Sequence, residues 1–238
     1  MRLLQPEDGA SLVEFLISMA ISAIVVAGTY DLYIAFSKSN LAQSDIVETQ
    51  NTAQAAMDIM VKELQRISVA PNITTTVTAN DTITFSSESA SGFSTGLNSS
   101  TTLNDTTASW AVNVFAPTAT TTYSVAIILG TGLGQTVPIS SNTATQLTTA
   151  SAWTPLPDAT SRYTITRPKQ FTRTAGNTLQ MKIGTGPLKS VADNITALSF
   201  SFSVNTTTIN LTARTKNKDM NLGTYRSFSR TDTAIMRN

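Results

Sequence analysis

The feature that most constrains this chain is a long apolar segment near its start. From Ala10 to Tyr30 the only charged side chain is that of Glu14, and after Asp31 apolar residues continue to Phe36. A membrane-spanning helix needs about 20 mostly apolar residues, so residues 10–36 are predicted to span a membrane. The alternative is a removed secretory signal, for which Ala27-Gly28-Thr29 imitates a cleavage site. Glu14 and the sequence that follows favour a retained helix.

Helical periodicity continues beyond the apolar segment. Apolar side chains recur every three or four residues in the second part, which predicts one buried face, formed by Ala53, Met57, Met60, Leu64 and Ile67. No proline occurs between residues 10 and 70, and Pro71 opposes further helix. The sequence therefore predicts one nearly continuous helix of about 60 residues, roughly 90 Å long. Residues 37–70 would be its amphipathic half, packed against a domain through Met57, Met60, Leu64 and Ile67.

Residues 71–238 change character and predict an antiparallel β domain. Most of the 41 threonines lie here, and threonine favours strands. Residues that alternate with period two predict strands at 82–85, 110–115, 163–167, 197–204, 208–214 and 225–228. A more continuously apolar run predicts a buried strand at 123–129, and Gly176-Asn177 predicts a hairpin turn. Segments 86–109 and 130–159 are expected to be long loops. The predicted fold class is α+β.

The composition argues against catalysis. The chain has no cysteine and no histidine, which removes the usual thiolate nucleophile, the usual general base and the commonest metal ligands. A metal ion would need to be a hard cation with oxygen ligands. We therefore expect no enzyme activity, no cofactor and no metal site.

Charge is strongly segregated along the chain. Residues 71–160 contain no lysine or arginine, whereas residues 161–238 contain 12 of them against three aspartates. The simplest interpretation is a solvated face of a sheet. A docking surface for an acidic protein or for nucleic acid is the alternative. Nucleic acid is not the expected partner, because there is no arginine-rich run and aromatic residues are not interleaved with the basic ones.

The start of the chain combines Gly9, Ala10, Ser11, Leu12, Val13 and Glu14 with an apolar helix. This pattern resembles the class III signal of type IV pilins and pseudopilins. The resemblance implies that residues 1–9 are a leader, that a prepilin peptidase cleaves after Gly9, and that the same enzyme N-methylates Ala10. Ala10 replaces the usual phenylalanine, and the leader has only Arg2 as a basic residue, with Glu7 and Asp8 beside the cut.

Glu14 also has a physical argument of its own. A carboxylate deep in a bilayer costs about 2.5–3.5 kcal/mol, so a partner is expected. Cleavage at Gly9 would place an α-amine one helical turn away, and in a bundle Glu14 could pair with the amine of a neighbouring helix. The alternative is that Glu14 merely reaches the cytoplasmic interface of an ordinary anchor.

Later segments of the sequence resemble particular subgroups of these pilins and pseudopilins. Residues 53–66, 193–200, 209–215 and the C-terminal residues 225–238, which end in Arg-Asn, are similar to PilW-type minor pilins and to J-type pseudopilins. The resemblance implies a structural subunit acting in initiation or at the tip of a filament. Its partners would be other pilins, the prepilin peptidase and the inner membrane, with residues 71–238 as a periplasmic head that later reaches the cell surface. The alternatives are a membrane-anchored adhesin that never enters a filament, a pseudopilin of type II secretion or competence, and DNA uptake through the basic C-terminal third.

Overall fold

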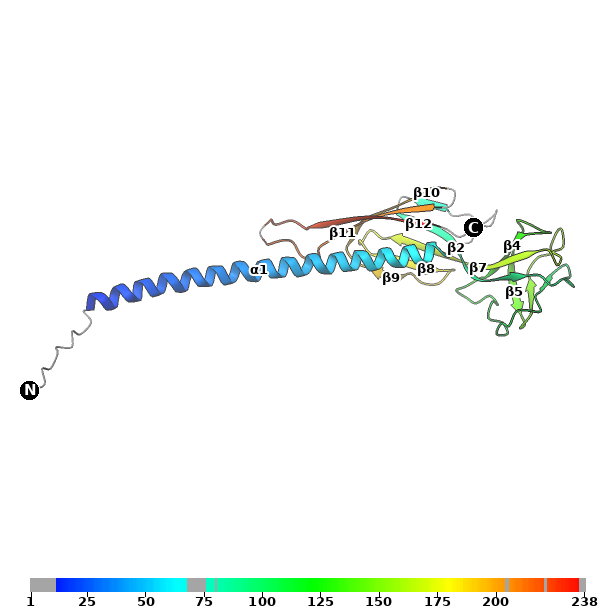
Figure 1. Ribbon diagram of the computed structural model, residues 1–238, viewed down its shortest axis with the longest axis horizontal. Helices are drawn as coiled ribbons and strands as arrows, with labels where there is room; N and C mark the ends of the chain where they lie inside the picture. Colours follow the sequence, from blue (N-terminus) through cyan, green and yellow to red (C-terminus); the bar gives the residue numbers. More distant parts are fainter. Residues whose placement is uncertain (1–11, 68–75, 80, 204–205, 221, 236–238) are drawn as a thin grey trace, which may run out of the picture.

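A computed structural model describes residues 12–67, 76–79, 81–203, 206–220 and 222–235. One helix, α1 (Leu12–Leu64), extends away from a β-rich head (Figure 1). Its 53 residues correspond to about 80 Å of helix. The expected continuation to residue 70 is wrong, because residues 65 and 66 form a turn and Ile67 pairs with Ser87 in an isolated β-bridge. The chain thus leaves the helix by joining the sheet, before Pro71 is reached.

The described part of the head is built from strands in two antiparallel sheets. Their bounds are β1 (Thr76–Ala79), β2 (Thr82–Phe93), β3 (Thr102–Asn104), β4 (Ser124–Leu129), β5 (Thr136–Asn142), β6 (Gln146–Thr149), β7 (Arg162–Arg173), β8 (Leu179–Ile183), β9 (Lys189–Ala192), β10 (Ile195–Ser203), β11 (Thr206–Arg214) and β12 (Ser227–Ile235). Together with α1 they make the α+β fold expected from the sequence.

The larger sheet is organised around two long strands. It has the order β1-β2-β7-β4-β5-β6-β3, and β8 and β9 branch from β7. β2 pairs with β7 along its whole length, while the other edge of β7 pairs first with β4 and then with β8. The predicted hairpin is confirmed as the β7–β8 connection, where Asn177 adopts a φ of 60°. The smaller sheet has the order β10-β11-β12.

The described residues of the head form two hydrophobic cores. The first joins α1 to both sheets and includes buried side chains from β2, β7, β8, β9, β10, β11 and β12. The second lies farther from the helix, among β3–β6, the end of β2 and the start of β7. We call these parts the proximal lobe and the distal lobe (residues 90–166). β2 and β7 run through both lobes, and Figure 1 shows the distal lobe at the end of the molecule opposite the N-terminus.

Three expectations about the distal lobe are wrong. Residues 110–115 form turns instead of a strand. Segment 86–109 contains most of β2 and all of β3, and segment 130–159 contains β5 and β6. These strands are rich in Thr, Ser and Asn, residue types that also dominate loops.

Candidate functional site

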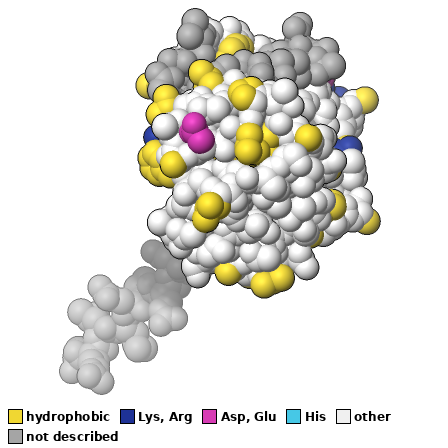
Figure 2. All heavy atoms as spheres, turned by 90° about the vertical axis from the view of Figure 1, so that its right-hand side faces the viewer, with side chains coloured by type: hydrophobic (Ala, Val, Ile, Leu, Met, Phe, Trp, Pro, Cys, Tyr) yellow, Lys and Arg dark blue, Asp and Glu magenta, His cyan; other side chains and the backbone are white. Residues whose placement is uncertain are grey.

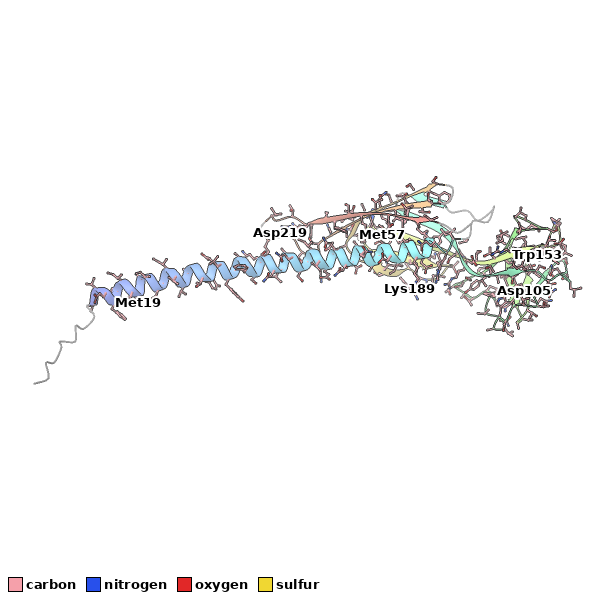
Figure 3. All side chains as sticks on the ribbon, in the orientation of Figure 1. Met19, Met57, Asp105, Trp153, Lys189 and Asp219 are labelled. Atoms are coloured by element: carbon pink, nitrogen blue, oxygen red, sulfur yellow. The ribbon has the colours of Figure 1, made fainter. Side chains whose placement is uncertain are left out.

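The first half of α1 is an apolar surface that the rest of the described chain does not cover. No residue from Leu12 to Phe36 is buried, and Leu12, Ile24 and Tyr33 are each more than 70% exposed. This part of the helix is long and apolar enough to cross a membrane. Its 25 residues correspond to about 37 Å, more than the roughly 30 Å of a hydrocarbon core. In Figure 3 Met19 marks this half, well separated from the head.

Two hydroxyl groups in the apolar half, those of Ser22 and Thr29, have partners within the helix. The Ser22 hydroxyl donates to the Ser18 carbonyl at 2.7 Å, and the Thr29 hydroxyl donates to the Val25 carbonyl at 3.0 Å. Hydroxyls satisfied in this way can enter a bilayer without leaving a donor unpaired. The apolar half of α1 is therefore chemically suited to lipid or to a bundle of similar helices.

Glu14 lies in the first turn of α1 and is exposed. A carboxylate at this position interacts favourably with the positive end of the helix dipole. Gly9 and Ala10 lie outside the described residues, so cleavage after Gly9 and methylation of Ala10 remain predictions. Ala10 and Glu14 are four positions apart in the sequence, the spacing of neighbours on one face of a helix.

The second half of α1 is fixed to the head by an apolar face. Met57, Met60 and Leu64 are fully buried, and Ile67 joins them in the core of the proximal lobe. Ala53 and Ala56, also buried, allow close approach of the sheet to the helix. Apolar packing of this kind holds the helix at a defined position on the head.

Two polar contacts add to this packing. Lys169, in the middle of β7, forms an ion pair with Glu63 in the last turns of α1, and its side chain is 2% exposed. Burial lowers the pKa of Lys169, and the Glu63 carboxylate opposes that shift. Arg230 of β12 donates a hydrogen bond to the Gln54 side chain. The helix is thus tied to both sheets by polar groups as well as by its apolar face.

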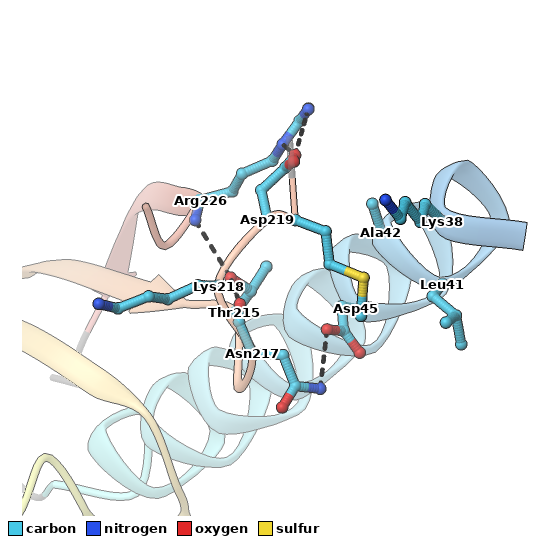
Figure 4. A pocket seen from close by; sticks show the side chains of 10 residues that line it. Lys38, Leu41, Ala42, Asp45, Thr215, Asn217, Lys218, Asp219 and Arg226 are labelled. Atoms are coloured by element: carbon cyan, nitrogen blue, oxygen red, sulfur yellow. Dashed lines mark hydrogen bonds and ion pairs between the residues drawn. The ribbon is translucent and has the colours of Figure 1, made fainter. Parts of the chain in front are cut away.

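A loop between β11 and β12 meets α1 where the helix leaves the head (Figure 4). Asn217 donates to the Asp45 carboxylate at 3.0 Å, and Arg226 binds Asp219 at 2.6 Å. A hollow of about 100 Å³ lies between this loop and the helix, and Lys38, Leu41 and Met220 are among the residues that line it. We call residues 215–220 and 222–226 the junction loop.

A second cavity of about 350 Å³ lies beside the junction loop. Its charged lining is mixed, with Asp45, Glu48 and Asp193 opposite Arg214 and Lys216. Among the described residues there is no group of three or more acidic, histidine or cysteine side chains that could hold a metal ion. The mixed charges give this cavity no clear preference for a ligand of one sign.

The distal lobe was not foreseen as a separate unit. Its core includes a buried pair in which the Tyr163 hydroxyl donates to the Asp105 carboxylate at 2.6 Å. The distal end in Figure 2 shows mostly uncharged polar surface with scattered hydrophobic side chains. One sequence signal could have revealed this lobe. It is the alternation of apolar residues on β5, at Val137 and Ile139, together with Leu147 on β6.

Comparison with protein-family models, with curated proteins and with solved structures finds no match to this chain.

Proposed function

We propose that this chain is a minor pilin or pseudopilin, a structural subunit of a type IV pilus or a related filament. The observation that carries the proposal is the exposed apolar half of α1, Leu12–Phe36, which has an acidic residue in its first turn and a separate head at its other end. The Gly9–Ala10 pair, which lies two positions before Leu12 in the sequence, matches the processing signal that the proposal requires.

An apolar helix of this kind needs a partner that removes it from water. Each fully buried large apolar side chain contributes about 1.5–3 kcal/mol, so more than a dozen exposed ones cannot be left in solvent. Before assembly the partner would be the inner membrane, with the head in the periplasm. After assembly the partner would be a bundle of similar helices, in which Glu14 pairs with the α-amine of a neighbouring chain.

The role proposed is structural rather than catalytic. The chain would be cleaved and methylated by the prepilin peptidase and would bind other minor pilins through α1, in initiation or at the tip of the filament. A type IV pilus, a type II secretion system and a competence apparatus share this anchor, and the neighbouring reading frames would distinguish them.

The direct test is the intact mass of the mature protein from a host that has the prepilin peptidase. We expect a chain that begins at Ala10 and carries one methyl group on its α-amine. A product that begins elsewhere, or that has an unmodified amine, would contradict the proposal. Expression in a host without the peptidase is the control and should leave residues 1–9 in place.

One observation favours a membrane-anchored adhesin as the second candidate. The distal lobe has its own core and lies at the end of the head opposite the anchor, where Leu97, Leu129 and Leu133 are exposed. Such a lobe is well placed to meet an external partner without entering a filament. Substitution of Glu14 separates the two candidates, because an anchor that acts alone does not need a carboxylate pair.

A further inference from the structure

We propose that residues 31–38 of α1 form a contact between two copies of this chain, staggered along their helices so that Asp31 of one copy pairs with Lys38 of the other. This contact rests on the proposed function, in which α1 lies in a bundle of similar helices. It adds the identity of the neighbour, a second copy of the chain, and the register between the two helices.

Asp31 and Lys38 stand alone on a long stretch of α1. They are the only charged residues between positions 15 and 44, and both side chains are exposed. Neither forms an ion pair with another residue in the part of the chain that the structure describes. They are seven positions apart, about 10.5 Å along the helix, so the two charges remain separate within one chain.

The surface between the two charges is apolar. Leu32, Tyr33 and Phe36 are each at least 60% exposed, and they lie on the stretch of α1 just before the head (Figure 1). Apolar side chains around an ion pair exclude water and strengthen the attraction between its charges. The segment thus combines an apolar centre with an opposite charge at each end, which is the composition of a protein–protein contact.

The membrane limits how two copies can meet. Chains inserted in the same membrane with the same orientation have parallel helices. At equal height Asp31 would face Asp31 and Lys38 would face Lys38, and like charges opposed in this way disfavour association. A shift of one to two helical turns, about 6–10 Å, instead brings Asp31 of the raised copy to Lys38 of the lower copy.

The staggered contact has a consequence for assembly. It uses different surfaces on the two copies, and it leaves Lys38 of the raised copy and Asp31 of the lower copy available for further chains. A contact between unlike surfaces that does not close on itself continues into an open filament. The arrangement of these two charges therefore favours a filament over a closed dimer.

The side chain of Lys38 is able to reach the neighbour. In Figure 4 it lies at the edge of the hollow beside Ala42, with no ion pair drawn to it. An exposed lysine with four methylene groups changes rotamer readily, and the Cα–Cβ bonds of a helix tilt toward its N-terminus. A stagger smaller than the full separation of the two residues is consequently enough.

The same stagger serves the pair proposed at the start of the helix. If Glu14 of the lower copy binds the α-amine of Ala10 in its neighbour, that neighbour is raised by about four residues, or about 6 Å. The raised copy then presents its Asp31 to Lys38 of the lower copy, which is the direction required above. One displacement satisfies both pairs, and this agreement is the reason to assign the contact to a second copy of the chain.

The test is a set of charge reversals in the full mature chain. The chain has no cysteine, so Leu133→Cys on the distal lobe provides a single exposed site for a donor or an acceptor fluorophore. Energy transfer in phosphatidylcholine vesicles, measured at increasing copies per vesicle, reports on association. The variants are Asp31→Lys, Lys38→Asp and the double reversal. Glu48→Lys is the matched control, a reversal at an exposed position of the same helix outside the segment.

We expect each single reversal to weaken association about tenfold, because an attraction becomes a repulsion, and we expect Glu48→Lys to have little effect. The double reversal should restore association. A mixture of Asp31→Lys chains with Lys38→Asp chains should also associate nearly as well as the original protein, because every contact between the two variants again joins opposite charges. Only a pair formed between chains predicts recovery in the mixture.

The other outcomes contradict the contact in distinct ways. If the reversals have no effect while Glu14→Gln weakens association, the bundle stands and the contact at residues 31–38 is wrong. If the double reversal recovers and the mixture does not, the pair forms within one chain. If neither recovers, the two residues act on insertion or folding, which tryptophan fluorescence of the head would show. If the original chain shows no energy transfer at any density, copies do not associate through α1, and the mass of the mature N-terminus still tests the proposed function separately.

Discussion

At the scale of single residues, Asp105 shows how one polar group organises the distal lobe. Its carboxylate accepts a hydrogen bond from the Tyr163 hydroxyl at 2.6 Å and another from the Thr107 amide at 2.9 Å, and it is 2% exposed. Gly92 leaves room for this pair, because a Cβ there would lie 2.6 Å from the Tyr163 hydroxyl oxygen. A buried carboxylate with several donors ties three parts of the lobe together.

Asp105 should make the stability of the distal lobe sensitive to acid. Burial, the largest influence, raises the pKa of Asp105, but the hydrogen bonds from Thr107 and Tyr163 together outweigh it and lower the pKa below 3.8. A carboxyl whose pKa is lower in the folded state stabilises the fold above its ordinary pKa, and this stabilisation is lost as the pH falls through the folded value. We expect Asp105→Asn to lower the free energy of unfolding near neutral pH by about 1–3 kcal/mol. Below pH 3.8 the free energy of unfolding should fall less in this variant than in the original protein.

Tryptophan fluorescence reports on this lobe, since Trp153 is buried in the distal core and Trp110 packs against it. Denaturant unfolding followed by this signal at neutral and acidic pH is the measurement. Asp232→Asn on β12, outside the lobe, is the control. Equal acid sensitivity in the Asp105→Asn variant and the original protein would refute the prediction.

Single residues also explain a failure of the sequence-based prediction. The alternating pattern predicts one strand that contains Trp110 and Phe115, but an odd separation would place the two side chains on opposite faces of it. In the structure a turn with a φ of 59° at Asn113 brings both rings into the distal core, 5.7 Å apart. The Asn142 side chain accepts from the Phe115 amide at 2.9 Å and stabilises this turn. A contact with a residue 27 positions away cannot be recognised from local alternation.

At the scale of elements, α1 was the most predictable part of the fold. Its two halves have different patterns, apolar on all sides and then apolar on one face, and each pattern persists over several turns. Its end was less predictable, because the change to a β-bridge at Ile67 depends on pairing with Ser87. Strands β4, β7, β10 and β11 were found where large apolar residues alternate or cluster, whereas the Thr- and Ser-rich β5 and β6 were not.

The packed face of α1 allows a matched test on neighbouring residues. Met60 is fully buried, whereas Ile59 is 41% exposed. We expect Met60→Ala to lower the free energy of unfolding by about 2–5 kcal/mol, because it leaves a cavity between the helix and the sheets. Ile59→Ala, made on the same turn of helix, should cost less than about 1 kcal/mol. Denaturant unfolding of the full chain in detergent, followed by circular dichroism, measures both, and equal losses would show that the helix does not pack as described.

At the scale of the whole molecule, the two ends have opposite chemical character. One end is the bare apolar helix, and the other is a lobe whose residues 90–161 contain no lysine or arginine. Most of the described basic residues lie between these ends, in the proximal lobe and its junction loop. This segregation of charge is visible in the sequence, whereas the separate core of the distal lobe is not. The reason is that β2 and β7 are each one continuous strand, and the two halves of each strand contribute to different cores.

The arrangement gives Glu14 a role that depends on the proposed assembly. Alone in a membrane, the carboxylate lies in the first turn of α1, near an interface, where its cost is small. In a bundle the same carboxylate is withdrawn from water and needs the amine of a neighbouring chain. Removing its charge should therefore leave membrane insertion unchanged and should impair entry into the filament.

We expect Glu14→Gln to reduce incorporation into sheared filaments at least about a hundredfold, since loss of one member of a buried ion pair costs roughly 3–5 kcal/mol. The amounts of the chain in the filament fraction and in the membrane fraction are compared by quantitative immunoblotting. Glu48→Gln is the matched control, because Glu48 is an exposed carboxylate on the same helix outside its apolar half. If Glu14→Gln enters filaments as well as Glu48→Gln does, the carboxylate has no partner in the bundle. The apolar helix is then better explained as a plain anchor, and the adhesin becomes the preferred function.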